Sequence, residues 1–180
     1  MISMTNYVYI ATSLDGFIAT IQGDLDWLNE IPNPENSDFG FSEFMQSIDA
    51  IVMGRKTFEK VLTFGVWPYD KPVFVLSSGK ISIPKDFDSK VKTITGTPIK
   101  IVEQLNVLGH ENLYIDGGVT IQGFLEEDLI DEMIITRVPI LLGDGIPLFG
   151  KLTKRLYFHH KKTEFLSDNL VKSYYVRIRE

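Results

Sequence analysis

Short apolar runs, each ended by a glycine or a polar turn, recur along the chain and predict the strands of a sheet. Most are rich in β-branched and aromatic residues, which favour strands. The runs predicted as strands cover residues 7–13, 50–53, 72–76, 91–95, 113–115 and 132–138. Residues 155–165 and 170–178 predict a closing hairpin with its turn at Ser167-Asp168-Asn169.

Helical spacing of apolar positions appears between several of these runs. Phe41, Phe44, Met45 and Ile48 predict an amphipathic helix over 37–47. Helices are also expected over 58–62, over 98–108 with a proline in its first turn, and after residue 118. Strands alternating with helices and ending in a hairpin predict an α/β fold, with a mixed sheet that is parallel at its centre and antiparallel at its end. A ligand should then bind beyond the carboxyl ends of the parallel strands.

The clearest change from a strand through a turn to a helix lies in residues 113–125. The strand breaks at Gly117-Gly118, and Val119, Ile121, Phe124 and Leu125 supply an apolar helix face. The first N–H groups of a helix lack intrahelical partners, so such a turn favours a bound phosphate. The alternative is a glycine turn that only packs a helix on the sheet.

Two further strand ends carry groups that suit phosphates. Gly54, Arg55, Lys56 and Thr57 combine a helix start with two cations and a hydroxyl, although a P-loop would need a glycine just before the lysine. Residues 77–80, Ser-Ser-Gly-Lys, suit a second phosphate such as the 2′-phosphate of NADP, with an ordinary polar loop as the alternative. Three such turns together favour a dinucleotide over three unrelated packing turns.

Composition narrows the class of protein. The 180 residues are 44% hydrophobic and 23% charged, which suits one globular domain over 1–180. The absence of cysteine excludes disulfides and thiolate metal sites, so a cytoplasmic protein is expected. No run is long enough for a membrane span, and a net charge of −6 argues against broad nucleic-acid binding. No metal site is predicted, because Asp24, Asp26 and Glu30 lack the remaining spacing of a calcium loop.

The order of the motifs resembles the dihydrofolate reductase superfamily. Residues 51–57 (IVMGRKT), 76–78 (LSS) and Gly117-Gly118 carry this resemblance. Residues 13–19 (SLDGFIA), the pair Asp49-Ala50 and residues 138–149 (VPILLGDGIPLF) are similar to the branch that contains the reductase half of the bifunctional riboflavin-biosynthesis deaminase-reductase. The resemblance covers nearly the whole chain.

That resemblance implies NADPH as the cofactor. It places Gly54, Arg55, Lys56 and Thr57 at the pyrophosphate, and the backbone of Ala11 and Ile18 at the nicotinamide carboxamide. The remaining implied cofactor residues are Leu76, Ser77 and Ser78 at the 2′-phosphate and Gly117, Gly118, Val119, Thr120 and Ile121 in the phosphate cradle.

Two carboxylates are candidates for the catalytic group. Asp38 lies sixteen residues before Gly54, near the substrate-binding carboxylate of folate reductases. Enclosed by Phe39, Phe41 and Trp27 it would have a raised pKa, whereas as a helix cap it would not. Asp116 precedes the glycine pair, as an acidic residue does in the riboflavin branch; a plain strand-end role is its alternative.

Departures from the riboflavin branch concern the substrate. Phe17 stands where that branch usually has a lysine, and its Asn-Pro-x-Leu segment has no counterpart after Thr57. The zinc deaminase half is also missing, and His110, His159 and His160 are expected at the surface.

The sequence therefore predicts an NADPH-dependent reductase acting on a small heterocycle of pteridine or pyrimidine type. The alternatives are a true dihydrofolate reductase and a non-catalytic NADP-binding module. An exposed strand of the closing hairpin leaves room for a homodimer.

Overall fold

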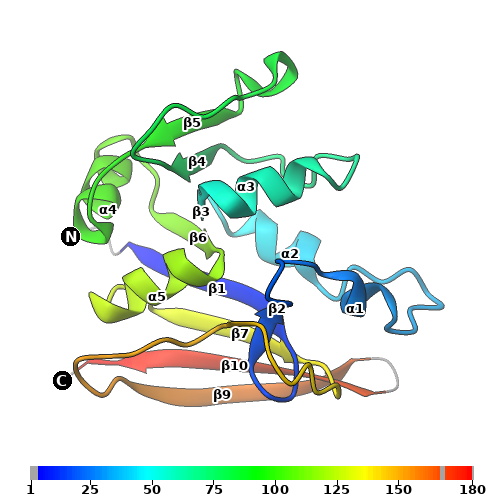
Figure 1. Cartoon of the computed structure of the whole chain (residues 1–180). Coiled ribbons are helices and arrows are strands. Elements are labelled where there is room, and N and C mark those ends of the chain that lie inside the picture. Colours follow the sequence, from blue (N-terminus) through cyan, green and yellow to red (C-terminus); the bar gives the residue numbers. More distant parts are fainter. Residues whose placement is uncertain (1–3, 167–168, 180) are drawn as a thin grey trace.

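One eight-stranded sheet runs through the protein (Figure 1). The computed structural model describes residues 4–166 and 169–179. The order of strands across the sheet is β5-β4-β3-β6-β1-β7-β10-β9. Their bounds are Thr5–Thr12 for β1, Ala50–Gly54 for β3, Val73–Leu76 for β4, Val91–Ile94 for β5, Asn112–Asp116 for β6, Glu132–Arg137 for β7, Tyr157–Leu166 for β9 and Leu170–Ile178 for β10.

The strands from β5 to β7 are parallel to one another, whereas β10 is antiparallel to both β7 and β9. This arrangement confirms the predicted mixed sheet with an antiparallel hairpin at its end. In the predicted turn Ser167-Asp168-Asn169, Ser167 and Asp168 lie outside the described residues. Since β1 is central, the first strand of the chain contacts two strands from its second half.

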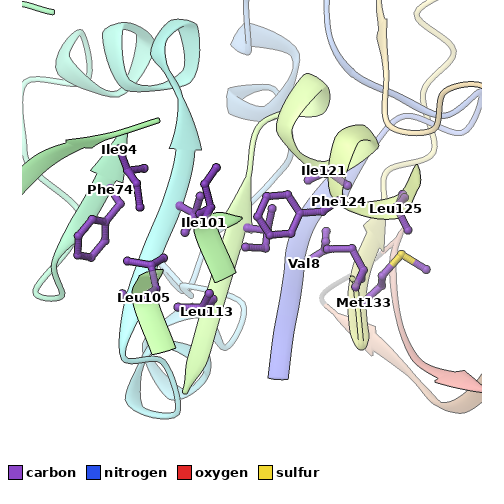
Figure 2. Packing of buried hydrophobic residues seen from close by; sticks show 14 of the residues in the cluster. Val8, Phe74, Ile94, Ile101, Leu105, Leu113, Ile121, Phe124, Leu125 and Met133 are labelled. Atoms are coloured by element: carbon purple, nitrogen blue, oxygen red, sulfur yellow. The ribbon is translucent and has the colours of Figure 1, made fainter. Parts of the chain in front are cut away.

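Helices cover both faces of the sheet. On one face, α4 (Pro98–Val107) and α5 (Gly118–Glu126) bury Ile101, Leu105 and Phe124 against Val8 and its neighbours, as Figure 2 shows. Each such side chain is worth about 1.5–3 kcal/mol of burial free energy. This face forms the larger part of the core.

The opposite face is covered by α2 (Phe41–Gln46) and α3 (Arg55–Leu62). Phe44 of α2 and Phe58 of α3 pack there with Ile51 and Met53. Val52, between these two strand residues, packs in the other cluster. The strand β3 is therefore buried on both sides, which explains its continuous apolar run.

Two details of the predicted helices differ in the structure. The helix predicted over 37–47 begins only at Phe41. Phe39 and Gly40 have φ of +55° and +87°, a conformation that no α-helix contains. In α5 the prediction of a buried Val119 is wrong, because its side chain is 83% exposed. Ile121, Phe124 and Leu125 are buried, so the rest of that face is confirmed.

Smaller elements complete the chain. The long loop holds one helical turn, α1 (Asp26–Asn29), as expected, and the loop 139–149 contributes β8 (Ile146–Pro147), which pairs with β2 (Phe17–Ala19). A 3-10 turn, η1, covers Lys85–Phe87. In the part of the chain that the structure describes, no helix combines the length and apolar character needed to cross a membrane.

Candidate active site

The three predicted phosphate turns are neighbours along one edge of the sheet. The last residues of β3 and β4, Gly54 and Leu76, are paired, and Met53 is paired with Asp116 at the end of β6. Because these strands are parallel, the segments that follow them leave the sheet at the same edge. The structure thus brings together turns that are distant in the sequence.

Two of these turns interlock through glycines and threonines. A Cβ atom on Gly117 would lie 2.2 Å from Oγ1 of Thr57, in the first turn of α3. A Cβ atom on Gly54 would lie 3.1 Å from Oγ1 of Thr120, in the first turn of α5. Gly117 also has φ of +90°, which favours glycine. The starts of α3 and α5 therefore pack against each other as closely as glycine allows.

Neither helix start is capped by a side chain of its own N-cap residue. The first N–H groups of both helices are of the kind that binds anions, with the partial positive charge of the helix dipoles behind them. Lys56 and Arg55 are exposed beside them, and Arg55 Nε donates to Oε1 of Glu59 at 2.7 Å. This arrangement suits a pyrophosphate.

A pocket of about 220 Å³ lies at the ends of β4 and β5, and β4 is the neighbour of β3, which leads into α3. The sequence predicted Leu76, Ser77 and Ser78 in such a site; the other lining residues are Ile94, Thr95 and Gly96. Ile94, the last residue of β5, and the two residues after it were missed because only the pairing of Leu76 with Ile94 brings the two strand ends together. The Ser77 hydroxyl donates to the carbonyl of Gly79 at 2.8 Å, which holds the loop closed.

Ile18 and Ala11, expected at the nicotinamide, lie at the same edge. A Cβ atom on Gly118 would approach Cδ1 of Ile18 to 3.0 Å, so β2 passes directly over the start of α5. Ala11 is next to last in β1 and pairs with Thr136 of β7. The structure therefore places both residues beside the carboxyl ends of the central strands.

Asp116 brings a carboxyl group to this edge at the end of β6. Its Oδ1 accepts from the N–H of Gly117 at 2.8 Å, and its Oδ2 accepts a long hydrogen bond from the Tyr69 hydroxyl at 3.5 Å. Removal from water raises the pKa of Asp116 to about 6, although both hydrogen bonds oppose this rise. The carboxyl group can thus carry a proton at near-neutral pH.

Tyr69 was not identified from the sequence as a site residue. It is buried, and burial together with the nearby Asp116 raises the pKa of its hydroxyl, which stays protonated and can only donate to the carboxylate. Its ring lies 6.5 Å from that of Phe41, between centroids. The only signal was its place in the proline-flanked segment Trp67-Pro68-Tyr69, which does not reveal a contact 47 residues away.

Asp38 does not have the environment expected of a pocket acid. It is exposed, and its two carboxylate oxygens accept from the N–H groups of Gly40 and Ser42 at 2.9 Å each. Hydrogen bonds from Ser42 and Gly40 lower the pKa of Asp38, so the prediction of an enclosed carboxylate with a raised pKa is wrong. The alternative of a capping role is confirmed in part: the carboxylate accepts from the N–H of Ser42 in the first turn of α2, but the N-cap residue is Gly40.

A buried lysine holds the turn that follows Asp38. Lys172 of β10 is 4% exposed, and its Nζ donates to the carbonyl of Phe39 at 2.8 Å and lies 3.4 Å from Oε2 of Glu164. The Tyr9 hydroxyl donates to the same carbonyl at 2.7 Å. Sequence reasoning missed Lys172, although its position two residues from the inward-facing Leu170 was an available signal.

Comparison with known proteins agrees with this geometry. Residues 7–172 match the family model described as the RibD C-terminal domain. The chain is 39% identical over 174 residues to the uncharacterized protein YwjB of Bacillus subtilis (strain 168), covering 94% of this chain and 96% of that protein.

Solved structures show the same fold. A candidate riboflavin biosynthesis protein from Shewanella sp. PV-4 is 53% identical, with a TM-score of 0.93 over 98% of this chain and 100% of that one. Dihydrofolate reductase from Enterococcus faecalis, complexed with NADP(H), is 17% identical, with a TM-score of 0.65 over 96% of each chain. The resemblance inferred from the motifs is confirmed, and with a family match across nearly all of its length the chain belongs to the RibD C-terminal domain family.

Proposed function

We propose that this protein is an NADPH-dependent reductase that delivers hydride to a small, flat nitrogen heterocycle of pteridine or pyrimidine type. The observation that carries the proposal is the interlocking of Gly117 with Thr57 and of Gly54 with Thr120, beside the protonatable Asp116. Membership of the RibD C-terminal domain family supports an oxidoreductase. The NADP(H) complex of the Enterococcus faecalis enzyme, which shares the fold, supports the choice of cofactor.

The residues at the sheet edge fit this dinucleotide. The open N–H groups of α3 and α5 would hold its pyrophosphate, and the pocket at Ser77 and Ser78 would hold the adenosine 2′-phosphate. Ala11 and Ile18 would border the nicotinamide, whose chemical contribution is a hydride. The anionic groups would thus meet backbone amides and cations on an acidic protein.

Asp116 would supply the acid–base function on the substrate side. A carboxyl group with a pKa near 6 can both donate a proton and accept a hydrogen bond at neutral pH. Tyr69 holds one of its oxygens, while the aromatic rings of Phe41 and Tyr69 lie close to each other on the same face of the sheet. A planar heterocycle that reaches Asp116 would therefore meet apolar ring surfaces.

Folate reduction is less well supported. That alternative depended on Asp38 as an enclosed carboxylate, whereas Asp38 is exposed and occupied with two N–H groups of its own loop. We therefore assign the catalytic carboxylate to Asp116. A homodimer and a cytoplasmic location stay predictions from the sequence.

Titration with NADPH and NADH, followed by nicotinamide fluorescence, tests the proposal. We expect preferential binding of NADPH, weakened about 10-fold by Ser77→Ala, because this variant removes a proposed hydrogen bond to the phosphate. Oxidation of NADPH is then screened with dihydrofolate, pterins and aminopyrimidines, and Asp116→Asn should lower turnover at least 10-fold with NADPH affinity unchanged. Failure of both nucleotides to bind would overturn the proposal, and binding without turnover of any heterocycle would leave the non-catalytic module.

A further inference from the structure

Arg55 and Glu59 form an ion pair on the outer surface of α3, one helical turn apart. Arg55 Nε lies 2.7 Å from Oε1 of Glu59, and the two side chains are 56% and 52% exposed. Pairs of this kind contribute little to stability, and their partners exchange readily with other ligands in solution. The guanidinium is therefore held by a partner that is easily displaced.

This pair stands beside the pocket at the ends of β4 and β5. Gly54 is paired with Leu76, so Arg55 and Ser77, the residues that follow them, leave the sheet side by side. None of the residues that line the pocket, Leu76 to Ser78 and Ile94 to Gly96, carries a charge. A phosphate dianion in that pocket would need cations from outside the lining. Arg55, at the neighbouring strand end, is one candidate, and Lys100, whose Cβ would lie 3.3 Å from a Cβ atom on Gly96, is another.

We propose that Arg55, which the sequence resemblance places at the pyrophosphate, meets the adenosine 2′-phosphate instead, and that Glu59 competes for it and thereby limits the preference for NADPH over NADH. This inference rests on the proposed function, since it concerns the cofactor of the same site. When the 2′-phosphate binds, Arg55 exchanges the carboxylate of Glu59 for the phosphate. Glu59 is left unpaired, next to two added negative charges. NADH has no phosphate at this position, so it leaves the ion pair intact.

This exchange weakens the binding of NADPH but not that of NADH. Glu59→Gln keeps the length of the side chain and an amide oxygen that can accept a hydrogen bond, but it removes the negative charge. Both the competition for Arg55 and the repulsion of the phosphate are then relieved. We expect the affinity for NADPH to rise about 3- to 6-fold at low salt, with that for NADH unchanged. The gain should shrink as salt rises, because the charges are exposed.

The test measures dissociation constants for NADPH, NADH, 2′-AMP and 5′-AMP with the wild-type protein, Glu59→Gln, Arg55→Ala and the double variant Arg55→Ala/Glu59→Gln. The matched control is Glu127→Gln, which makes the same change of charge at the far end of α5. The inference is supported if Glu59→Gln binds NADPH and 2′-AMP more tightly than the wild-type protein does, while its affinities for NADH and 5′-AMP are unchanged. Glu127→Gln should leave all four affinities unchanged.

The outcomes separate this inference from the proposed function. If the wild-type protein binds neither dinucleotide, the reductase proposal itself fails. If NADPH binds and Glu59→Gln leaves its affinity unchanged, only the role of Glu59 is overturned. A gain of the same size when Glu59→Gln is made in the Arg55→Ala background would also overturn it, because the competition runs through Arg55.

Discussion

The hydroxyl oxygen of Thr57 occupies the space in which a side chain on Gly117 would begin, 2.2 Å from the ideal Cβ position. The contact joins the first turn of α3 to the strand-to-helix turn between β6 and α5. Any residue larger than glycine at position 117 must move one helix start away from the other. The geometry of the proposed pyrophosphate site thus depends on the absence of a Cβ atom at position 117.

Gly117→Ala should therefore destabilise the protein by more than about 2 kcal/mol, because it adds a steric clash to an unfavourable φ of +90°. Urea unfolding measures the loss. Thr57→Ala should restore part of it in the double variant, since it removes the nearest atom. Strictly additive effects of the two substitutions would contradict the described contact.

Asp116 should make the folded protein less stable as the pH rises. Its folded pKa of about 6 lies above the unfolded value, so between pH 4 and 6 the native state binds more protons than the unfolded state. Stability from this group is fully present below about pH 4 and is lost as the pH rises through about 6. Asp116→Asn should remove this slope and raise stability at pH 8 by up to about 3 kcal/mol.

Urea unfolding of both proteins from pH 4 to 8 measures this difference. The control is Glu126→Gln, which removes the charge of an exposed carboxylate in α5. Asp131 would be a poor control, because its carboxylate forms an ion pair with Arg179. If the free energy of unfolding depends on pH in Asp116→Asn as it does in the wild-type protein, the pKa of Asp116 is not raised by folding.

Lys172→Met should cost about 2 kcal/mol, because it removes a buried donor from the Phe39 carbonyl and a cation from beside Glu164. In a domain of this size the melting temperature should fall by about 4–8 °C. Lys92→Met, on the exposed side of β5, is the matched control and should change it by less than about 2 °C. Equal effects of the two substitutions would argue against the buried contact.

The cap formed by Asp38 predicts different results for two substitutions. Asp38→Ala should destabilise the protein by about 1 kcal/mol, whereas Asp38→Asn, which keeps an acceptor, should cost only a few tenths. Because the folded pKa is lowered, the stability from this carboxylate is present above the unfolded pKa and lost as the pH falls through the folded one. Thermal unfolding at pH 7 and pH 3 measures both effects. A large loss of turnover in Asp38→Asn without a loss of stability would return Asp38 to the list of catalytic residues.

Local pattern was sufficient to predict the sheet and most helices. The apolar run ending at Gly54 is buried on both faces, as a central parallel strand must be, and its sequence shows this directly. The helix α2 could not be bounded in this way, because its first turn is displaced by the positive φ of Phe39. That conformation is held by Lys172 and Tyr9, which lie 133 and 30 residues away.

The site residues likewise divide into those visible in the local sequence and those that depend on distant contacts. The turn at Gly117-Gly118 was visible because glycine pairs mark strand-to-helix turns, while the contact of Gly117 with Thr57 depends on how two strands pair. The raised pKa of Asp116 likewise results from removal from water in the folded chain. Val119 was misplaced because a short helix tolerates an exposed valine next to a buried face.

The central position of β1 also affects how the chain is made. Its strand partners begin at Asn112 in β6 and Glu132 in β7, so the first apolar segment leaves the ribosome long before either is available. At about 5–20 residues per second, that segment waits roughly 5 to 20 s without its neighbours. During synthesis its apolar side chains therefore lack the strands that cover them in the folded protein, and exposed apolar surface of this kind favours aggregation. Closure of the sheet is a late event that waits for the second half of the protein.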